Sequence, residues 1–163
     1  MDGKLRNMTA IYLLKNQKVL LLYRQGGKVV TNVWTGSAGG HFEKDELNDP
    51  KACVLRELNE ELGLQPEDID GLTLRYIALR STKGEIRQNY YFFAALKDTV
   101  DENLSSNEGI CKWHDLDEIS SLEMPLSAKY VMEHYLKTGR WTKDLYVGVV
   151  APGGMLFSQM TES

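Results

Sequence analysis

The chain has 163 residues, of which 42% are hydrophobic and 26% charged, and its formal net charge is −4 at pH 7. This length and composition are typical of one soluble globular domain with a buried core. The negative charge argues against sequence-independent binding to nucleic acids, which depends on Lys and Arg neutralising phosphates, but it leaves room for a free nucleotide bound through a metal ion.

The cysteine content and the N-terminus predict a cellular location. Cys53 and Cys111 lie far apart and lack the spacing of metal ligands, so we expect two small buried hydrophobic residues in a reducing compartment. The N-terminal stretch lacks the long apolar centre and cleavage site of a signal peptide, and no apolar run is long enough to span a bilayer. We therefore expect a cytoplasmic protein without a membrane partner.

Two strands joined by a turn are predicted near the N-terminus. Residues 5–14 and 18–24 are rich in apolar and β-branched side chains, with Asn16-Gln17 between them. The run 19–23 is apolar on both faces, which is typical of a strand in the middle of a sheet. A further short strand, over residues 29–34, is expected to lead the chain towards a glycine-rich segment.

A helix is predicted from about Pro50 to Leu62. Asp49 can cap its N-terminus, and Pro50 suits the first helical position, where no N–H is needed. Gly63 suits a left-handed C-cap. Local signals therefore define both ends of this helix.

The acidic residues Glu57, Glu60 and Glu61 of this helix lie within an arc of roughly 100°, so they share one face. Leucines on the opposite side should pack on the core and fix the direction of the acids: Leu55, Leu58 and Leu62. A hard divalent cation such as Mg²⁺ or Mn²⁺ would remove the repulsion between these like charges. With a backbone carbonyl from the preceding glycines, the acids form a candidate metal site; the alternative is a solvated acidic face.

Beyond the helix, alternating residues 71–80 and 88–96 predict a β-hairpin with a turn at 81–85. The polar loop 97–107 is long enough to close over a substrate or to be disordered. Residues 108–114 are predicted to form another short strand.

A second helix is predicted from Pro125 or Ser127 to Lys137, with Gly139 as its stop. Its inward positions are expected to be Leu126, Tyr130, Val131, His134 and Tyr135. Residues 141–160 should form a terminal hairpin or an edge strand. Without a repeat or linker, the whole chain is predicted to be one domain over residues 1–163, of class α/β with a mixed sheet.

The stretch from Gly40 to Leu64 resembles the Nudix box of the MutT-like hydrolases. That pattern is Gly, five residues, Glu, seven residues, and then Arg-Glu-apolar-x-Glu-Glu-x-Gly-apolar. Gly40 and Glu46 match its first part, and RELNEELGL from Arg56 matches its second part without a fault. Nine residues separate Glu46 from Arg56 where the pattern has seven. We expect the loop around residues 47–49 to absorb the difference, because loop length costs little free energy to change.

The resemblance, which covers residues 5–138, implies a Nudix-type α/β/α sandwich with two main helices and the site at the end of the box helix. It also implies hydrolysis of a nucleoside diphosphate linked to another group, with Mg²⁺ or Mn²⁺ as cofactor. By position, Glu57, Glu60 and Glu61 would bind the metal together with the Gly39 carbonyl, and one of these acids would act on the attacking water.

Other residues receive supporting roles from the same resemblance. Arg56 would hold the carboxylates in place, with Gly40 and Glu46 in support. A further catalytic acid on a later loop would be Glu108, with Glu85 as the alternative. Weaker candidates for phosphate contacts are His41, Arg24, Arg80 and Arg87, and weaker candidates for base stacking are Trp34, Tyr90, Tyr91 and Phe92, although aromatic residues in strands belong to the core by default.

Two substrate sub-patterns of the family are missing. Arg80 stands where ADP-ribose hydrolases have a proline about sixteen residues past the box, and the arginine-rich signature of coenzyme A hydrolases is absent. What remains resembles the nucleoside triphosphatases, including those that convert 8-oxo-dGTP to a monophosphate and pyrophosphate. Open alternatives are a non-catalytic nucleotide sensor and an enzyme acting on a nucleotide sugar, isopentenyl diphosphate or capped RNA. The expected partner is a small nucleotide, with the oligomeric state open and a homodimer compatible.

Overall fold

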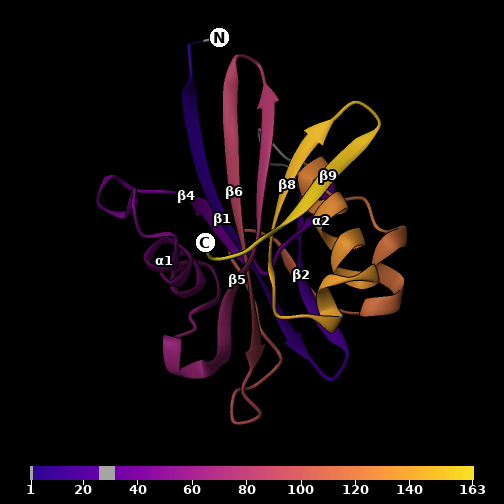
Figure 1. The fold of residues 1–163 in the computed structure, drawn as a ribbon. Helices are drawn as coiled ribbons and strands as arrows, with labels where there is room; N and C mark the ends of the chain where they lie inside the picture. Colours follow the sequence, from indigo (N-terminus) through magenta and orange to yellow (C-terminus); the bar gives the residue numbers. More distant parts are fainter. Residues whose placement is uncertain (1, 26–31) are drawn as a thin grey trace.

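The computed structural model describes residues 2–25 and 32–163. Within these ranges nine strands form one mixed sheet, and one α-helix covers each face (Figure 1). This arrangement confirms the expected α/β/α sandwich with two main helices. No helix in the described ranges is long and apolar enough to cross a membrane.

The strands follow the predicted order along the chain. They are β1 (Lys4–Lys15), β2 (Lys18–Arg24), β3 (Val33–Thr35), β4 (Ala38–His41), β5 (Ile69–Thr82), β6 (Glu85–Leu96), β7 (Ile110–Asp115), β8 (Leu145–Ala151) and β9 (Gly154–Met160). The sheet order is β3-β2-β1-β6-β5-β8-β9, with β4 paired to β1 and β7 paired to β2. Pairs β1/β6 and β5/β8 are parallel and the other pairs are antiparallel.

Both predicted hairpins are present, and the strand expected over 29–34 is described only in part. Strands β5 and β6 form the first hairpin, and β8 and β9 form the second at the edge of the sheet. Strand β3 begins at Val33, while residues 29–31 lie outside the described ranges.

Helix α1 (Pro50–Leu62) has the predicted bounds. The Asp49 carboxylate accepts a hydrogen bond from the backbone N–H of Ala52 at 3.0 Å, and Gly63 has φ 69°, the left-handed value expected of a C-cap. Four short 3-10 helices complete the secondary structure of the described ranges: η1 (Lys44–Glu46), η2 (Pro66–Asp68), η3 (Leu116–Ser121) and η4 (Gly139–Trp141).

The sheet separates two hydrophobic cores, because successive side chains of a strand point to opposite faces. On β1, Ile11 and Leu13 pack with Val54 and Leu58 of α1, whereas Tyr12 packs on the side of α2. Strand β2 is buried on both faces, as its apolar run predicted. The expected burial of cysteine is confirmed for Cys53, while Cys111 is half-buried.

Helix α2 spans Leu126–Lys137, close to its predicted range, but its inward face differs in part. Val131 and Tyr135 are buried as expected. The prediction for Leu126 is wrong, since this residue opens the helix and is 40% exposed. Tyr130 and His134 are only half-buried, and small residues and a methionine complete the inward face: Ser127, Ala128 and Met132.

The loop 97–107, expected to close over a substrate or to be disordered, is tied to the sheet. Lys15 lies 3.9 Å from Asp98 and 3.3 Å from Glu102, and the Trp113 indole donates a hydrogen bond to the Glu102 carbonyl at 2.8 Å. Two apolar side chains of the loop also pack against the core on the α1 side: Val100 and Leu104. These contacts argue for a fixed structural loop.

Candidate active site

The three acids on α1 are not equivalent in the folded chain. The opposite face of the helix is buried through Val54, Leu58 and other apolar residues, which fixes its rotation relative to the sheet. The side chain of Glu57 is 13% exposed and that of Glu61 is 8% exposed, whereas Glu60 is 55% exposed. Two acids therefore point into the protein and one lies at the rim.

The double glycine allows β4 to approach both β1 and α1. A Cβ at Gly39 would collide with the backbone carbonyl of Thr9, and φ of 156° at Gly39 disfavours any other residue there. A Cβ at Gly40 would overlap the carboxylate of Glu57. The Gly39 N–H also donates to Glu61 Oε2 at 3.3 Å. The glycines thus make room for both inward carboxylates.

Arg56 holds the box together. Its guanidinium donates two hydrogen bonds to Glu46, from Nε to Oε2 and from Nη2 to Oε1, both at 2.8 Å. It also donates from Nη1 to Glu57 Oε1 at 2.9 Å and to Glu60 Oε2 at 3.1 Å, and from Nη2 to the His41 carbonyl at 3.1 Å. This planar fork fixes four neighbours at once.

Glu46 occupies its predicted place despite the two extra residues before α1. It is buried, and the hydrogen bonds from Arg56 are the main reason why the pKa of its carboxyl falls to about 2. Its Oε1 also accepts the backbone N–H of Glu43, which fixes η1. The extra length lies in the turn at 47–49, where Leu47 is exposed. Glu46 and Arg56 thus meet although nine residues separate them.

Glu61 lies beside a second arginine and a second acid. Arg24, at the end of β2, approaches Glu61 Oε1 at 3.7 Å and Glu108 Oε2 at 3.6 Å. Glu108 reaches this point because the next residue, Gly109, packs so closely on the backbone of Tyr23 that a Cβ would not fit. Glu57, Glu61 and Glu108 are called the carboxylate cluster below.

Burial raises the pKa of Glu61 to about 7. Arg24 and the Gly39 N–H oppose this rise, while the negative charges of Glu57 and Glu108 add to it. With this pKa, Glu61 is expected to be about half protonated at pH 7, and a bound cation would favour its ionised form.

The other polar candidates lie on the opposite side of β4. His41 Nε2 accepts a hydrogen bond from Arg6 Nη2 at 2.9 Å. Burial, followed by the charges of Arg6 and Arg87, lowers the pKa of its imidazole. Glu85 pairs with Lys4, Arg6 and Arg87. It therefore lies away from the carboxylate cluster, and the alternative to Glu108 is not supported by the geometry.

The aromatic candidates divide between core and surface. Tyr91 and Phe92 are buried, on the α2 side and the α1 side of the sheet respectively. Trp34 and Tyr90 are half-buried, and the Trp34 ring packs against Tyr23 at a ring-centroid distance of 4.9 Å, with the two rings tilted by 46°. Among the four, these two rings alone are partly exposed.

Sequence reasoning missed Arg6, which contacts His41 and shares Glu85 with Arg87. Its strand alternates without a motif, so the residue is indistinguishable from a solvent-facing arginine before the pairing of β1 with β6 is known. The detectable signal is the alternation itself, which places Arg6 on the same face of β1 as Tyr12.

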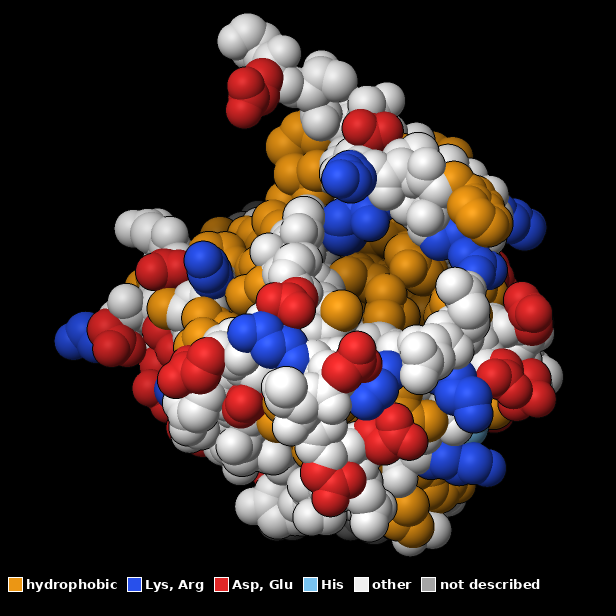
Figure 2. Space-filling view, turned by 90° about the horizontal axis from the view of Figure 1, so that it is seen from below, with side chains coloured by type: hydrophobic (Ala, Val, Ile, Leu, Met, Phe, Trp, Pro, Cys, Tyr) orange, Lys and Arg blue, Asp and Glu red, His pale blue; other side chains and the backbone are white. Residues whose placement is uncertain are grey.

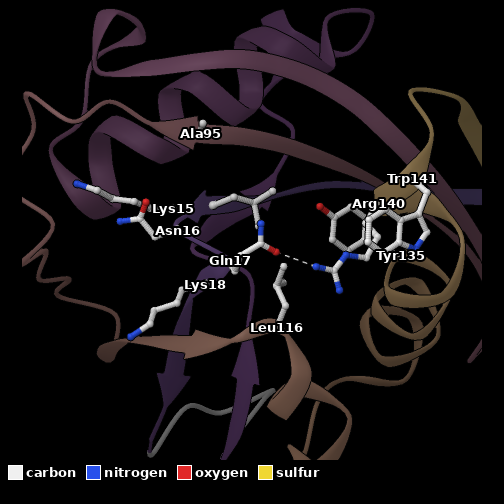
Figure 3. A pocket seen from close by; sticks show the side chains of 10 residues that line it. Lys15, Asn16, Gln17, Lys18, Ala95, Leu116, Tyr135, Arg140 and Trp141 are labelled. Carbon is white, nitrogen blue, oxygen red and sulfur yellow. Dashed lines mark hydrogen bonds between the residues drawn. The ribbon is translucent and has the colours of Figure 1, made fainter.

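A cavity of about 300 Å³ opens elsewhere, beside the turn that joins β1 and β2 (Figure 3). Seen from below, the surface on this side is hollowed over hydrophobic side chains, with Lys and Arg around the opening (Figure 2). None of the predicted site residues lines the cavity, which is formed by Leu14, Lys15, Asn16, Gln17, Lys18, Ala95, Leu116, Tyr135, Arg140 and Trp141. The carboxylate cluster and this cavity are thus separate features.

The carboxylate cluster has the chemistry of a divalent cation site. Glu57, Glu61 and the Gly39 carbonyl offer the hard oxygen ligands that Mg²⁺ prefers, and the glycines leave no side chain between them. In the ranges 2–25 and 32–163 no group of three His, Cys, Asp or Glu side chains is already arranged as a metal site. Arg56 instead neutralises Glu57 and Glu60.

Comparisons with known proteins agree with this architecture. A mutator MutT protein from Bacillus halodurans has 21% sequence identity and a TM-score of 0.65, covering 97% of this chain and 99% of that chain. The Escherichia coli ORF135 protein also has 21% identity, with a TM-score of 0.66 and coverage of 85% and 94%. A Caenorhabditis elegans Ap4A hydrolase has 18% identity, a TM-score of 0.63 and coverage of 85% and 99%. At these identities the likeness shows a shared fold.

The family assignment comes from the sequence as well. No curated protein sequence matches the chain. The model of the NUDIX domain matches residues 4–135, which include the carboxylate cluster and the whole box. The chain therefore belongs to the Nudix family and is a Nudix hydrolase.

Proposed function

We propose that this protein hydrolyses a phosphoanhydride bond in a nucleoside diphosphate linked to another group, with Mg²⁺ as its cofactor and Mn²⁺ as a substitute. The observation that carries the proposal is the pair of inward carboxylates, Glu57 and Glu61, set against the two glycines of β4. Burying two acids together raises the free energy of the folded chain unless a cation neutralises them.

The burial and contacts of each residue indicate its role in the proposed site. Glu57, Glu61 and the Gly39 carbonyl hold the metal, and Glu60 binds at the rim. When bound, the metal neutralises phosphate oxygens and makes water easier to deprotonate. Arg56 positions the carboxylates through its contacts with Glu46, Glu57 and Glu60.

Two further groups act beside the helix. Glu108 adds a negative charge from the loop before β7, and Arg24 holds it near Glu61. Buried Glu46 acts only through Arg56, as a support that keeps the guanidinium in place.

The proposed substrate is a nucleoside triphosphate, with an oxidised purine nucleotide such as 8-oxo-dGTP as the leading case, giving a monophosphate and pyrophosphate. Two absences in the sequence support it: Arg80 replaces the proline typical of ADP-ribose hydrolases, and the coenzyme A signature is missing. We expect the protein to act in the cytoplasm on free nucleotides, as one domain.

A substrate panel tests the proposal. Nucleoside triphosphates, 8-oxo-dGTP, nucleotide sugars and isopentenyl diphosphate are assayed for phosphate and pyrophosphate release, with Mg²⁺ or with EDTA. We expect Mg²⁺-dependent release of pyrophosphate from a triphosphate. Tight binding of one nucleotide without hydrolysis of any would contradict the proposal and favour a sensor.

The Glu61→Gln variant is the matched control for the panel, because it keeps the size of the side chain and the Gly39 contact while removing the charge. Circular dichroism checks that the variant remains folded. Full Mg²⁺-dependent activity in Glu61→Gln would show that the carboxylate cluster is not the site.

A further inference from the structure

The last strand of the sheet has an open edge. Strand β9 stands at one end of the sheet order, and within residues 2–25 and 32–163 it pairs with β8 alone (Figure 1). The backbone N–H and C=O groups on its other edge therefore meet no strand. Such an edge can accept a further strand through the same hydrogen-bond pattern that holds the sheet together.

Strand β9 lacks the features that usually protect an open edge. Its seven residues, GMLFSQM, include no charged side chain and no proline. Its pairing with β8 runs from Ala151↔Gly154 to Leu145↔Met160 without a bulge. Charges, prolines and bulges are the devices by which proteins prevent an edge strand from pairing with another chain. The edge is therefore open to pairing, and no charge of its own opposes an identical strand.

An apolar stripe crosses the sheet and ends at this edge. The register pairs Leu79 of β5 with Val149 of β8, and Val149 with Leu156 of β9, so the three side chains point to the same face. Met160 lies on this face too, four residues beyond Leu156. Val149 is 45% exposed, Leu156 is 70% exposed and Met160 is 48% exposed. Exposed apolar side chains that gather in one patch indicate an interaction surface.

Neither main helix covers this stripe. Tyr146 of β8 and Phe157 of β9 belong to the core on the α2 side, and they alternate along their strands with the residues of the stripe. The stripe thus lies on the face of the sheet turned away from α2. Helix α1 packs mainly against β4 and β1, and β6, β5 and β8 lie between β1 and β9 in the sheet.

A second copy of the chain fits both the open edge and the stripe. A two-fold axis at Ser158 pairs the two β9 strands antiparallel, with Leu156 directly opposite Met160 of the second copy. The stripe of one copy then continues into the stripe of the other, and no charged residue of β9 faces another. A strand with charged side chains on this face would instead place them against Leu156 and Val149, which favours the identical strand as the partner.

We propose that the protein forms a symmetric homodimer in which the two β9 strands pair antiparallel across a two-fold axis at Ser158. The two sheets then become one continuous sheet. This inference goes beyond the proposed function and does not depend on it. The carboxylate cluster stays open in the dimer, because α1 and β4 lie on the far side of β6, β5 and β8.

The first experiment measures the oligomeric state with and without a charge at the axis. Analytical ultracentrifugation of wild type in EDTA, from low to high micromolar concentration, should show a monomer–dimer equilibrium. Ser158→Lys places two like charges opposite each other and should weaken dimerisation at least about tenfold. Ser120→Lys adds the same charge at an exposed position of η3, and it should dimerise like wild type.

A second pair of variants tests the apolar stripe. Leu156→Ser acts twice in each dimer, because the axis repeats every substitution, and should weaken dimerisation about 10- to 100-fold. Leu47→Ser is its control, since Leu47 is also exposed, at 57%, but lies in the turn 47–49. It should leave the equilibrium unchanged. All four variants alter exposed side chains, so at concentrations where wild type is monomeric they should keep its melting temperature.

A cross-link tests the position of the axis. A short bismaleimide should join Ser158→Cys into a covalent dimer, because the two introduced thiols face each other. Ser120→Cys and wild type should stay single chains, since Cys53 is buried and Cys111 half-buried.

Three results would overturn the proposal: a wild type that is monomeric at every concentration, a Ser158→Lys variant that dimerises like wild type, or a dimer in which Ser158→Cys is not cross-linked. If wild type dimerises through β9 yet releases phosphate or pyrophosphate from no nucleotide, the proposed function fails while the dimer stands.

Discussion

The carboxylate cluster and the arginine row, formed by Arg6 of β1, Arg87 of β6 and Arg80 of β5, both gather like charges, but the chain compensates them differently. The cluster and its neighbours are held by Arg56 and Arg24, and burial raises the pKa of Glu61 to about 7, so that a proton is still partly bound near neutral pH. The row shares the single carboxylate Glu85 and cannot shed its charge, because guanidinium stays protonated. A bound proton can therefore neutralise a carboxylate of the cluster, whereas the arginines of the row keep their positive charge.

The largest expected effect separates the inward acids from the rim acid. Glu57→Gln or Glu61→Gln should lower kcat about 10²- to 10³-fold, since each would remove a metal ligand worth several kcal/mol. Glu60→Gln should cost about tenfold or less, because Glu60 is more than half exposed. Steady-state kinetics with Mg²⁺ measure both. Equal losses of kcat in Glu60→Gln and Glu61→Gln would show that the inward and rim acids do not differ in function.

Arg56 gives the next largest effect, since it compensates the acids directly. Arg56→Gln should lower activity about 10- to 100-fold and lower the free energy of unfolding by about 3 kcal/mol or more, because buried Glu46 loses its partner. Arg56→Lys keeps the charge but loses the planar fork, so its activity and its stability should lie between those of wild type and those of Arg56→Gln. Urea denaturation measures the free energy of unfolding. An Arg56→Gln variant as stable as wild type would show that the contact between Arg56 and Glu46 does not stabilise the fold.

Melting temperatures of the metal-free protein over a pH series test whether a proton on Glu61 stabilises the carboxylate cluster. The pKa of Glu61 is near 7 in the folded chain and near 4.5 when unfolded, so the unfolded state ionises first. Its contribution to stability is complete below about pH 4.5 and is lost as the pH rises to about 7. We expect the melting temperature to fall on the order of 5 °C over this window.

Two acids of the box, Glu61 and Glu46, provide checks on this pH series. Glu61→Gln should abolish the fall, and saturating Mg²⁺ should reverse it in wild type. Glu46 acts in the opposite sense: its pKa near 2 in the folded chain adds stability above about pH 4.5 that is lost as the pH falls towards 2. A wild-type protein whose melting temperature rises from pH 4.5 to 7 in EDTA would contradict the burial of Glu61.

The smallest expected effect comes from Arg24. Arg24→Gln removes a cation that lowers the pKa of Glu61, so the fall in melting temperature should extend to higher pH by less than about one unit. The same series measures it. An unchanged profile would show that the 3.7 Å approach carries no electrostatic coupling.

Local rules account for the parts of the molecule that the sequence predicts well. The caps at Asp49 and Gly63 depend only on the local sequence, so α1 begins and ends where predicted. The β5–β6 hairpin likewise follows from alternation and a short turn. The clustering of Glu57 with Glu61 follows from helical spacing, because residues four apart in a helix share a face.

Long-range pairing explains what the sequence alone does not reveal. The arginine row needs the register of β1 on β6, two strands about eighty residues apart in the chain. The different exposure of Glu60 and Glu61 depends on how α1 is rotated against β4, which spacing does not specify. Loop 97–107 looked free because its anchors, Lys15 and Trp113, lie on other strands.

The turn at 47–49 has a consequence for how this family is searched. Glu46 and Arg56 meet in a two-point contact although nine residues, not seven, separate them. In this chain the meeting of the two side chains is kept although the number of residues between them differs from the pattern. A fixed-length pattern would discard this chain, whereas one that allows a variable gap before the helix, and demands only the glycine and the helical acids, would recover it.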